Sequence, residues 1–273
     1  MTTSVAEPVR DDRAAVDKAI SLLVAFGDQA SSGLGVTELA RRAQMSKSTA
    51  YRVLGMLERN AVVERVGTGY RLGSRLHELG RAVYAPGHDR IRDLLLPFLT
   101  DLYEITRHTV HLATLHGTDV VYLAKLYGHR PVPAPSRIGG RLPAHCTAVG
   151  KVQLAYDYAA AAQLTGPLRR FTARTITDPV KLAAELDRIR RDGIAFDEQE
   201  SQLGLSCVAA PVFAAGGRPV AAMSIAGPLG RIDTRRLSVD LRRVTAAASQ
   251  AMVRARVACP VITSRARGPG PWR

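Results

Sequence analysis

The segment from Val36 to Tyr70, VTELARRAQMSKSTAYRVLGMLERNAVVERVGTGY, constrains the fold more than any other part of the chain. It holds a short amphipathic stretch, a polar turn at Gln44-Met45, and a second helical stretch that Ser46 is suited to cap. Two β-prone runs then flank Gly67-Thr68-Gly69, which is a hairpin signal. This order predicts a winged helix-turn-helix, a fold that presents its second helix to the DNA major groove.

The beginning of the predicted second helix carries side chains that could read DNA. Sequence reading needs donors and acceptors at the helix end that enters the groove. Arg52 could bind guanine O6 and N7, whereas Lys47 lies at the turn and suits a phosphate. The alternative is a solvated basic face that contacts no DNA. For the wing residues, this alternative is about as well favoured as a DNA contact. The predicted DNA contacts are Lys47, Ser48, Thr49, Tyr51, Arg52, Arg65, Thr68 and Arg71.

Local signals predict where the first helix begins, and the net charge indicates the class of binding partner. Thr37 is predicted to cap the first helix, with Glu38 in its first turn near the positive helix end. The chain carries a formal charge of +14, which favours a polyanionic partner but says nothing about the fold. From Arg13 to Arg75 there are ten Lys or Arg residues against five Asp or Glu residues. Charge alone would also suit a constitutive architectural DNA binder.

The composition excludes several other classes. No apolar run approaches the ~20 residues that a membrane span needs, and the first residues lack the apolar stretch of a secretory signal. The three cysteines include no CxxC pair, which argues against a disulfide framework and a structural zinc site. We therefore expect a cytoplasmic protein without membrane contact, metal or cofactor.

The remainder of the chain predicts a separate α+β domain, since strand pairs alternate with helices without regular βαβ order. Residues 109–115 with 120–126, and 206–213 with 220–226, are predicted hairpins. Helices are predicted at 148–156, at 179–191 behind the cap Asp178, and around 237–252, while Pro97 is expected to break or kink a helix over 91–106. The predicted order is a disordered tail 1–12, a winged helix-turn-helix domain 13–73, a linker helix 74–90, a mixed α/β domain 91–258 and a disordered tail 259–273.

Four segments in order make the chain resemble the IclR family of bacterial transcriptional regulators. They are SKSTAYRVLGMLE with GYRLG, GGRLPAHCTAVGKVQLA, GIAFDEQESQLGLSCVAAPVF and GRPVAAMSIAGP. The resemblance implies an effector-binding domain related to GAF and profilin-like folds. It also implies a homodimer or a dimer of dimers on a palindromic operator, and most often a repressor that senses a small organic or aromatic acid. One departure is Cys146, which stands where the family commonly has alanine.

The resemblance also implies an effector cavity. Backbone N–H groups at the start of the helix near Thr147 would suit a carboxylate. Asp197 must either orient a ligand hydroxyl or hold neighbouring backbone, because a bare carboxylate would repel an acid. Cys207, taken alone, is typical of a small buried hydrophobic residue. The implied cavity residues are Thr147, Ala148, Asp197, Leu205, Cys207 and Ser224.

An enzyme is the rival class, in which Cys207, Asp197 and His145 would be nucleophile, orienting group and base. The chain has no nucleophile elbow, P-loop or Rossmann glycine pattern, so no catalytic residue is predicted. His145 and Cys146 could be metal ligands, but adjacent residues converge poorly on one ion. The remaining histidines of interest alternate over a strand and its turn and are expected at the surface or in the core; they are His108, His111 and His116.

Overall fold

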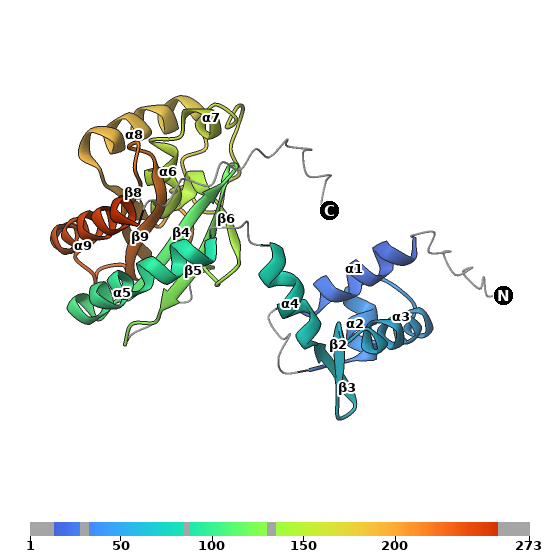
Figure 1. The fold of residues 1–273 in the computed structure, drawn as a ribbon. Helices are drawn as coiled ribbons and strands as arrows, with labels where there is room; N and C mark the ends of the chain where they lie inside the picture. The colour runs from blue at the N-terminus through green and yellow to red at the C-terminus, as the bar shows by residue number, and fades with distance from the viewer. Residues whose placement is uncertain (1–13, 28–32, 84–87, 130–134, 256–273) are drawn as a thin grey trace. The chain divides into compact units, whose positions relative to one another are not determined.

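The computed structural model describes residues 14–27, 33–83, 88–129 and 135–255 (Figure 1). The chain divides into two compact units, Met1–Tyr84 and Ala85–Arg273. The predicted tails 1–12 and 259–273 lie outside the described residues, as does part of the loop predicted at 30–35. None of the described helices is both long enough and apolar enough to cross a membrane.

The N-terminal unit is a winged helix-turn-helix, as predicted. Its antiparallel sheet has the order β1-β3-β2, and in β2 and β3 Val66 pairs with Gly69 across the turn of the wing. Leu22 and Phe26 pack with Leu54 and Tyr70 in one small core. The elements are α1 (Ala15–Ala25), β1 (Leu34–Gly35), α2 (Val36–Arg42), α3 (Lys47–Arg59), β2 (Val63–Val66), β3 (Gly69–Leu72) and α4 (Ser74–Val83).

The ends of these helices confirm one predicted cap and correct another. The Ser46 hydroxyl accepts a hydrogen bond from the Thr49 amide at 3.2 Å, as expected of an N-cap. The predicted cap at Thr37 is wrong, because α2 already begins at Val36 and its N-cap, Gly35, has no side chain to accept. Glu38 does lie in the first turn. Its carboxylate binds the guanidinium groups of Arg41 and Arg42, at 2.7 and 2.6 Å.

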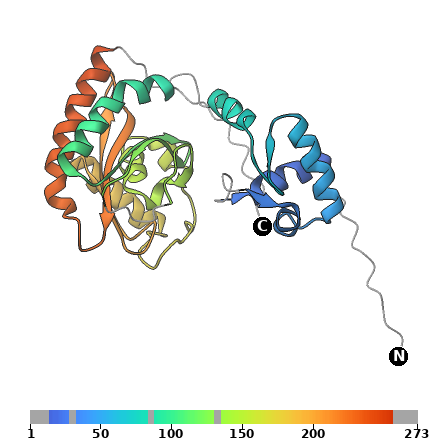
Figure 2. The same ribbon diagram turned by 90° about the horizontal axis from the view of Figure 1, so that it is seen from below.

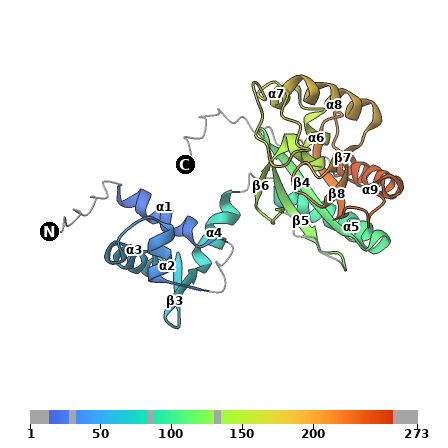
Figure 3. The ribbon, with the colours of Figure 1, turned by 180° about the vertical axis from the view of Figure 1, so that it is seen from behind.

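The C-terminal unit is a six-stranded antiparallel sheet with helices on both faces (Figures 1 and 2). α5 and α9 pack on one face, whereas α6 packs on the other with α8 outside it (Figure 3). The strand order is β6-β5-β4-β9-β8-β7. The main elements are α5 (His88–Thr106), β4 (Thr109–His116), β5 (Asp119–Leu126), β6 (Arg141–Pro143), α6 (Ala148–Leu154), α7 (Tyr158–Ala161), α8 (Pro179–Asp192), β7 (Ala195–Glu198), β8 (Leu205–Phe213), β9 (Pro219–Pro228) and α9 (Thr234–Arg254).

Both predicted hairpins of this unit are confirmed, as β4–β5 and β8–β9. The predicted start and end of α8 are also present. The Asp178 carboxylate accepts from the Val180 amide at 2.8 Å, and Gly193 ends the helix with φ of 64°. Pro97 lies inside α5, which continues to Thr106, so a break there is wrong. α4 ends at Val83 and α5 begins at His88, so the predicted linker range 74–90 contains the whole of α4 and the first three residues of α5.

One glycine fixes the position of α6. A Cβ atom on Gly150 would lie 2.2 Å from the carbonyl oxygen of Ala144, in the 3₁₀ turn Ala144–Cys146 that precedes the helix. Only a residue without a side chain allows this approach of backbone to backbone. The tight packing holds the beginning of α6 against the sheet, where a cavity opens.

Candidate functional site

The exposed face of α3 carries four of the eight predicted DNA-contacting residues. Lys47, Ser48, Tyr51 and Arg52 are exposed, and the Tyr51 side chain is 55% accessible. The opposite face, including Leu54, is buried in the core of the N-terminal unit. This separation follows from the helical period of the sequence. The polar beginning of the helix is therefore available to a duplex.

Hydrogen bonds at the beginning of α3 order the hydroxyl groups there. The Ser46 hydroxyl donates to the Thr49 hydroxyl at 2.9 Å while accepting from the Thr49 amide. The Ser48 hydroxyl lies 3.1 Å from the Ser46 hydroxyl oxygen. Thr49 is half-buried, so its side chain serves the cap, whereas Ser48 is exposed. Of these two residues, Ser48 has the freer hydroxyl for a DNA contact.

The wing presents two arginines in different states. The Arg65 guanidinium lies over the Tyr70 ring, 5.6 Å from its centre. Arg65 is exposed, as is Thr68 in the turn of the wing. Arg71 forms an ion pair with Glu64 at 2.7 Å, and this hydrogen bond lowers the pKa of the Glu64 carboxyl. A phosphate would have to compete with Glu64 for Arg71. Arg65 and Thr68 are the less encumbered wing contacts.

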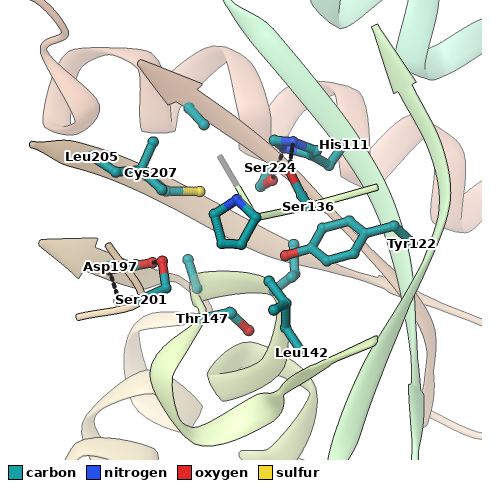
Figure 4. Close-up of a pocket in the computed structure, with 14 residues that line it drawn as sticks. His111, Tyr122, Ser136, Leu142, Thr147, Asp197, Ser201, Leu205, Cys207 and Ser224 are labelled. Carbon is teal, nitrogen blue, oxygen red and sulfur yellow. Dashed lines mark hydrogen bonds between the residues drawn. The ribbon is translucent and has the colours of Figure 1, made fainter. Parts of the chain in front are cut away.

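A cavity in the C-terminal unit brings together all six residues that the family resemblance implied (Figure 4). The space within it that the centre of a water molecule can reach is about 20 Å³. That is room for roughly one water. Its wall also contains residues that were not predicted, namely His111, Tyr122, Pro135, Ser136, Leu142, Val149, Ser201 and Ala226.

The register of the sheet explains why segments far apart in sequence meet at this cavity. Asp197 on β7 is the partner of Cys207 on β8, and Cys207 is also the partner of Ala226 on β9. His111 on β4 is the partner of Ser224 on β9. Because side chains of paired residues project to the same face, these groups share one wall.

Asp197 holds backbone, which was one of its two predicted roles. Its carboxylate accepts hydrogen bonds from the Glu200 amide at 2.7 Å and from the Ser201 hydroxyl at 2.6 Å. Burial raises the pKa of Asp197, and these hydrogen bonds oppose the rise. The carboxylate thereby fixes the turn after β7, which places Ser201 in the cavity wall.

The other side of the cavity is the beginning of α6. Thr147 is its N-cap, and its hydroxyl accepts from the Gly150 amide at 3.1 Å. The amides of Ala148 and Val149 are the first two of the helix, so they have no partner within it. Both residues line the cavity.

A buried ion pair lies beside the cavity, and the sequence did not indicate it. The Lys151 ammonium binds the Glu200 carboxylate and also lies 3.5 Å from Glu185. The Lys151 side chain is 1% exposed. Burial raises the pKa of Glu200 to about 7, although the charge of Lys151 acts in the opposite direction. Asp197 and Lys151 therefore hold the same turn. Asp197 binds the backbone amide of Glu200, and Lys151 binds the Glu200 side chain.

The two described cysteines have the chemistry of structural thiols. Burial raises the pKa of both Cys146 and Cys207 to about 12, so the nucleophilic thiolate is scarce at neutral pH. The Cys146 thiol lies 3.3 Å from the Pro143 carbonyl oxygen, and the His145 Nε2–H group can donate to the Arg169 carbonyl at 3.0 Å. Within the described ranges no cluster of three or more His, Cys, Asp or Glu residues could hold a metal.

Comparison with known proteins gives matches over both units. Residues 15–67 match the family model described as the IclR helix-turn-helix domain, and residues 85–253 match the one described as the C-terminal part of the bacterial transcriptional regulator IclR. The chain is 36% identical to the HTH-type transcriptional regulator KdgR of Escherichia coli (strain K12), over 83% of this chain and 87% of that protein. It is 34% identical to the regulator XynR of the same strain, over 82% and 89%.

A solved structure extends the comparison to the fold. It is the crystal structure of an IclR homolog from Microbacterium hydrocarbonoxydans complexed with 4-hydroxybenzoate. Its TM-score is 0.72 at 28% identity, covering 89% of this chain and all of that one.

Proposed function

This chain belongs to the IclR family of bacterial transcriptional regulators, and we propose that it is a repressor whose operator binding is controlled by a small organic or aromatic acid in the cavity of its C-terminal unit. The observation that carries the proposal is that one chain combines a polar, exposed face on α3 with a cavity lined by all six residues that the family resemblance implied. The chromosome is its target, so we expect it in the cytoplasm.

On the DNA side, we propose that α3 enters the major groove and that Arg52 binds a guanine edge. Lys47, Ser48 and Tyr51 are placed on the same exposed surface. The wing would reach the adjacent backbone or minor groove through Arg65 and Thr68. A homodimer or a dimer of dimers would present two such helices to the halves of a palindromic operator.

On the ligand side, an acid would meet the Ala148 and Val149 amides and the hydroxyl of Ser224. The relative whose structure contains 4-hydroxybenzoate supports an acid as the class. An acid of several carbons exceeds a cavity with room for roughly one water, so its walls must separate on binding. Such a ligand changes DNA affinity only if it prefers one arrangement of the regulator over the other.

The test combines a thermal-shift screen of small organic and aromatic acids with a gel shift on DNA upstream of the protein's own gene. We expect at least one acid to raise the melting temperature and to change operator affinity. Ser224→Ala and Cys207→Leu should leave operator binding intact and blunt the response to the acid. Loss of folding in both variants would mean that these positions are only core.

Two results would favour other functions. Equal affinity for operator and random DNA, with steep salt dependence, would indicate a constitutive architectural binder. Sustained turnover that disappears in Cys207→Ser would indicate an enzyme, a function that the buried, protonated thiol disfavours.

A further inference from the structure

Four side chains form a continuous line of hydrogen bonds across the sheet and end at the cavity. Lys125 on β5, His111 on β4 and Ser224 on β9 are consecutive register partners, so they occupy one row on one face. Ser136 lies against this row. Its hydroxyl is 2.9 Å from His111 Nε2, and His111 Nδ1 is 3.2 Å from the Ser224 hydroxyl (Figure 4).

Lys125 begins the line as a donor. Its ammonium donates to the Ser136 carbonyl at 2.9 Å and to the Ser136 hydroxyl at 3.1 Å. It also lies 4.7 Å from the centre of the Tyr127 ring, an arrangement that favours the charged form. An ammonium group cannot accept a hydrogen bond, so Lys125 must be the donor in its hydrogen bond with the Ser136 hydroxyl.

That direction passes through Ser136 to the imidazole. The Ser136 oxygen accepts from Lys125, which leaves its single proton for His111 Nε2. In the opposite arrangement Nε2–H would donate to Ser136, and the Ser136 proton would have no acceptor within the described residues. A buried hydroxyl proton without a partner is unfavourable. Nε2 is therefore the acceptor.

The imidazole then sets the role of Ser224. Burial, assisted by the Lys125 charge, lowers the pKa of His111 to about 3, so the ring is neutral at pH 7 and carries one proton. With Nε2 accepting, this proton resides on Nδ1 and is donated to the Ser224 oxygen. The Ser224 proton is left for the cavity side, where the Cys207 sulfur lines the same cavity and is at best a weak acceptor.

A second hydroxyl is free on the same wall. Tyr122 is 5% exposed and lines the cavity, and its hydroxyl makes no hydrogen bond in the part of the chain that the structure describes. Figure 4 shows this hydroxyl pointing into the cavity. Its ring packs against His111, with centres 5.4 Å apart. A hydroxyl that lines a cavity without a protein partner is a group that a ligand can satisfy.

We propose that Lys125, acting through Ser136 and His111, fixes the Ser224 hydroxyl as a donor to the cavity, so that this wall with Tyr122 selects an acid bearing a second oxygen as acceptor. The inference rests on the proposed acid-sensing function and names the ligand class more narrowly. Carbonyl, hydroxyl and carboxylate oxygens qualify. A methyl group or an ammonium group at the same place does not, because it leaves the Ser224 proton without a better acceptor than sulfur.

The direction of the line is tested without any ligand. Long-range ¹H–¹⁵N spectra of the full-length protein, labelled in its seven histidines, distinguish the two neutral tautomers, and the spectrum of His111→Gln assigns the signal. We expect the Nδ1–H form in the native protein and in Lys125→Arg, which keeps a donor-only cation. Lys125→Met should shift it to Nε2–H, and the surface variant Lys181→Met should not. An Nε2–H tautomer or an imidazolium in the native protein would overturn the inference.

The ligand class is tested by calorimetric titration with two pairs of probes. They are 4-oxopentanoate with 4-methylpentanoate, and 4-hydroxybenzoate with 4-methylbenzoate. In at least one pair the oxygen-bearing acid should bind roughly tenfold or more tightly than its methyl counterpart, and Ser224→Ala should abolish the difference. Equal binding within both pairs would overturn the selection. No binding of any acid, in a protein with Nδ1–H in place, would instead refute acid sensing and leave the direction supported.

Discussion

Replacing Lys151 with methionine tests how the turn beside the cavity is held. Lys151 is fully buried and pairs with Glu200, which retains one carboxylate oxygen without a hydrogen bond among the described residues. Removing one partner of a buried ion pair costs roughly 3–5 kcal/mol, because the remaining charge stays desolvated. For a domain of this size roughly 2–4 °C of melting temperature is lost per kcal/mol. Lys151→Met should therefore melt on the order of 6–20 °C lower.

The cost should depend on pH in a defined direction. Glu200 has a pKa of about 7 in the folded chain, against 4.5 for an ordinary glutamate. The folded state thus holds this proton more tightly, and the stability it contributes is full below pH 4.5 and is lost as the pH rises to about 7. Without Lys151, which lowers that pKa, the loss should continue to higher pH. The destabilisation by Lys151→Met should accordingly be larger at pH 8 than at pH 5.5.

Urea denaturation of the full chain at these two pH values provides the measurement. The double variant Lys151→Met, Glu200→Gln should recover part of the lost stability, since it removes the stranded carboxylate. The exposed Lys181→Met is the matched control and should change little. A loss below about 1 kcal/mol at pH 8, the level of a surface pair, would refute the reasoning.

Three further changes test other elements. Gly150→Ala should lower the free energy of unfolding by roughly 1–3 kcal/mol, because its Cβ would overlap the Ala144 carbonyl; Gly55→Ala, with open space around it, should be neutral or stabilising, and equal thermal shifts would contradict the packing argument. Ser46→Ala should remove roughly 1 kcal/mol of stability by loss of the cap in urea titrations, whereas no change would mean that water replaces it. Arg52→Ala should weaken operator binding by roughly 1–3 kcal/mol and relax base preference in gel shifts; unchanged affinity would remove Arg52 from the reading surface.

Elements defined by local signals could be predicted from the sequence. α3 has a serine cap, a helical apolar stripe and a glycine-bounded hairpin after it, so its position followed from nearby residues. The β4–β5 and β8–β9 hairpins were predictable for the same reason. Thr37 failed as a cap by two positions, because nothing local decides whether Val36 and Thr37 end the extended segment or begin the helix.

The walls of the cavity depend on pairings that no local pattern encodes. β4 is buried on both faces over most of its length, so alternation could not assign His111 to the cavity side. Its neighbour Ser224 is 113 residues away. No local pattern around Lys151 indicates that Glu185 on α8 and Glu200 in the turn after β7 enclose its ammonium group. β6 and β7 were missed because strands of three or four residues carry little alternation and, unlike β2 and β3, these two do not flank a tight glycine turn.

The two faces of the central strands have different roles: one lines the cavity, and the other packs in the core of the domain. On β9, Ser224 and Ala226 face the cavity, while Met223 and Ile225, which alternate with them, are fully buried toward the opposite layer of helices. If the cavity binds the effector as proposed, exchanging a residue on the first face should alter which acid is bound without disturbing the packing beneath α5 and α9. A few substitutions on that face could then adapt the cavity to a new metabolite. The residues that alternate with them along the strand keep the domain folded and need not change.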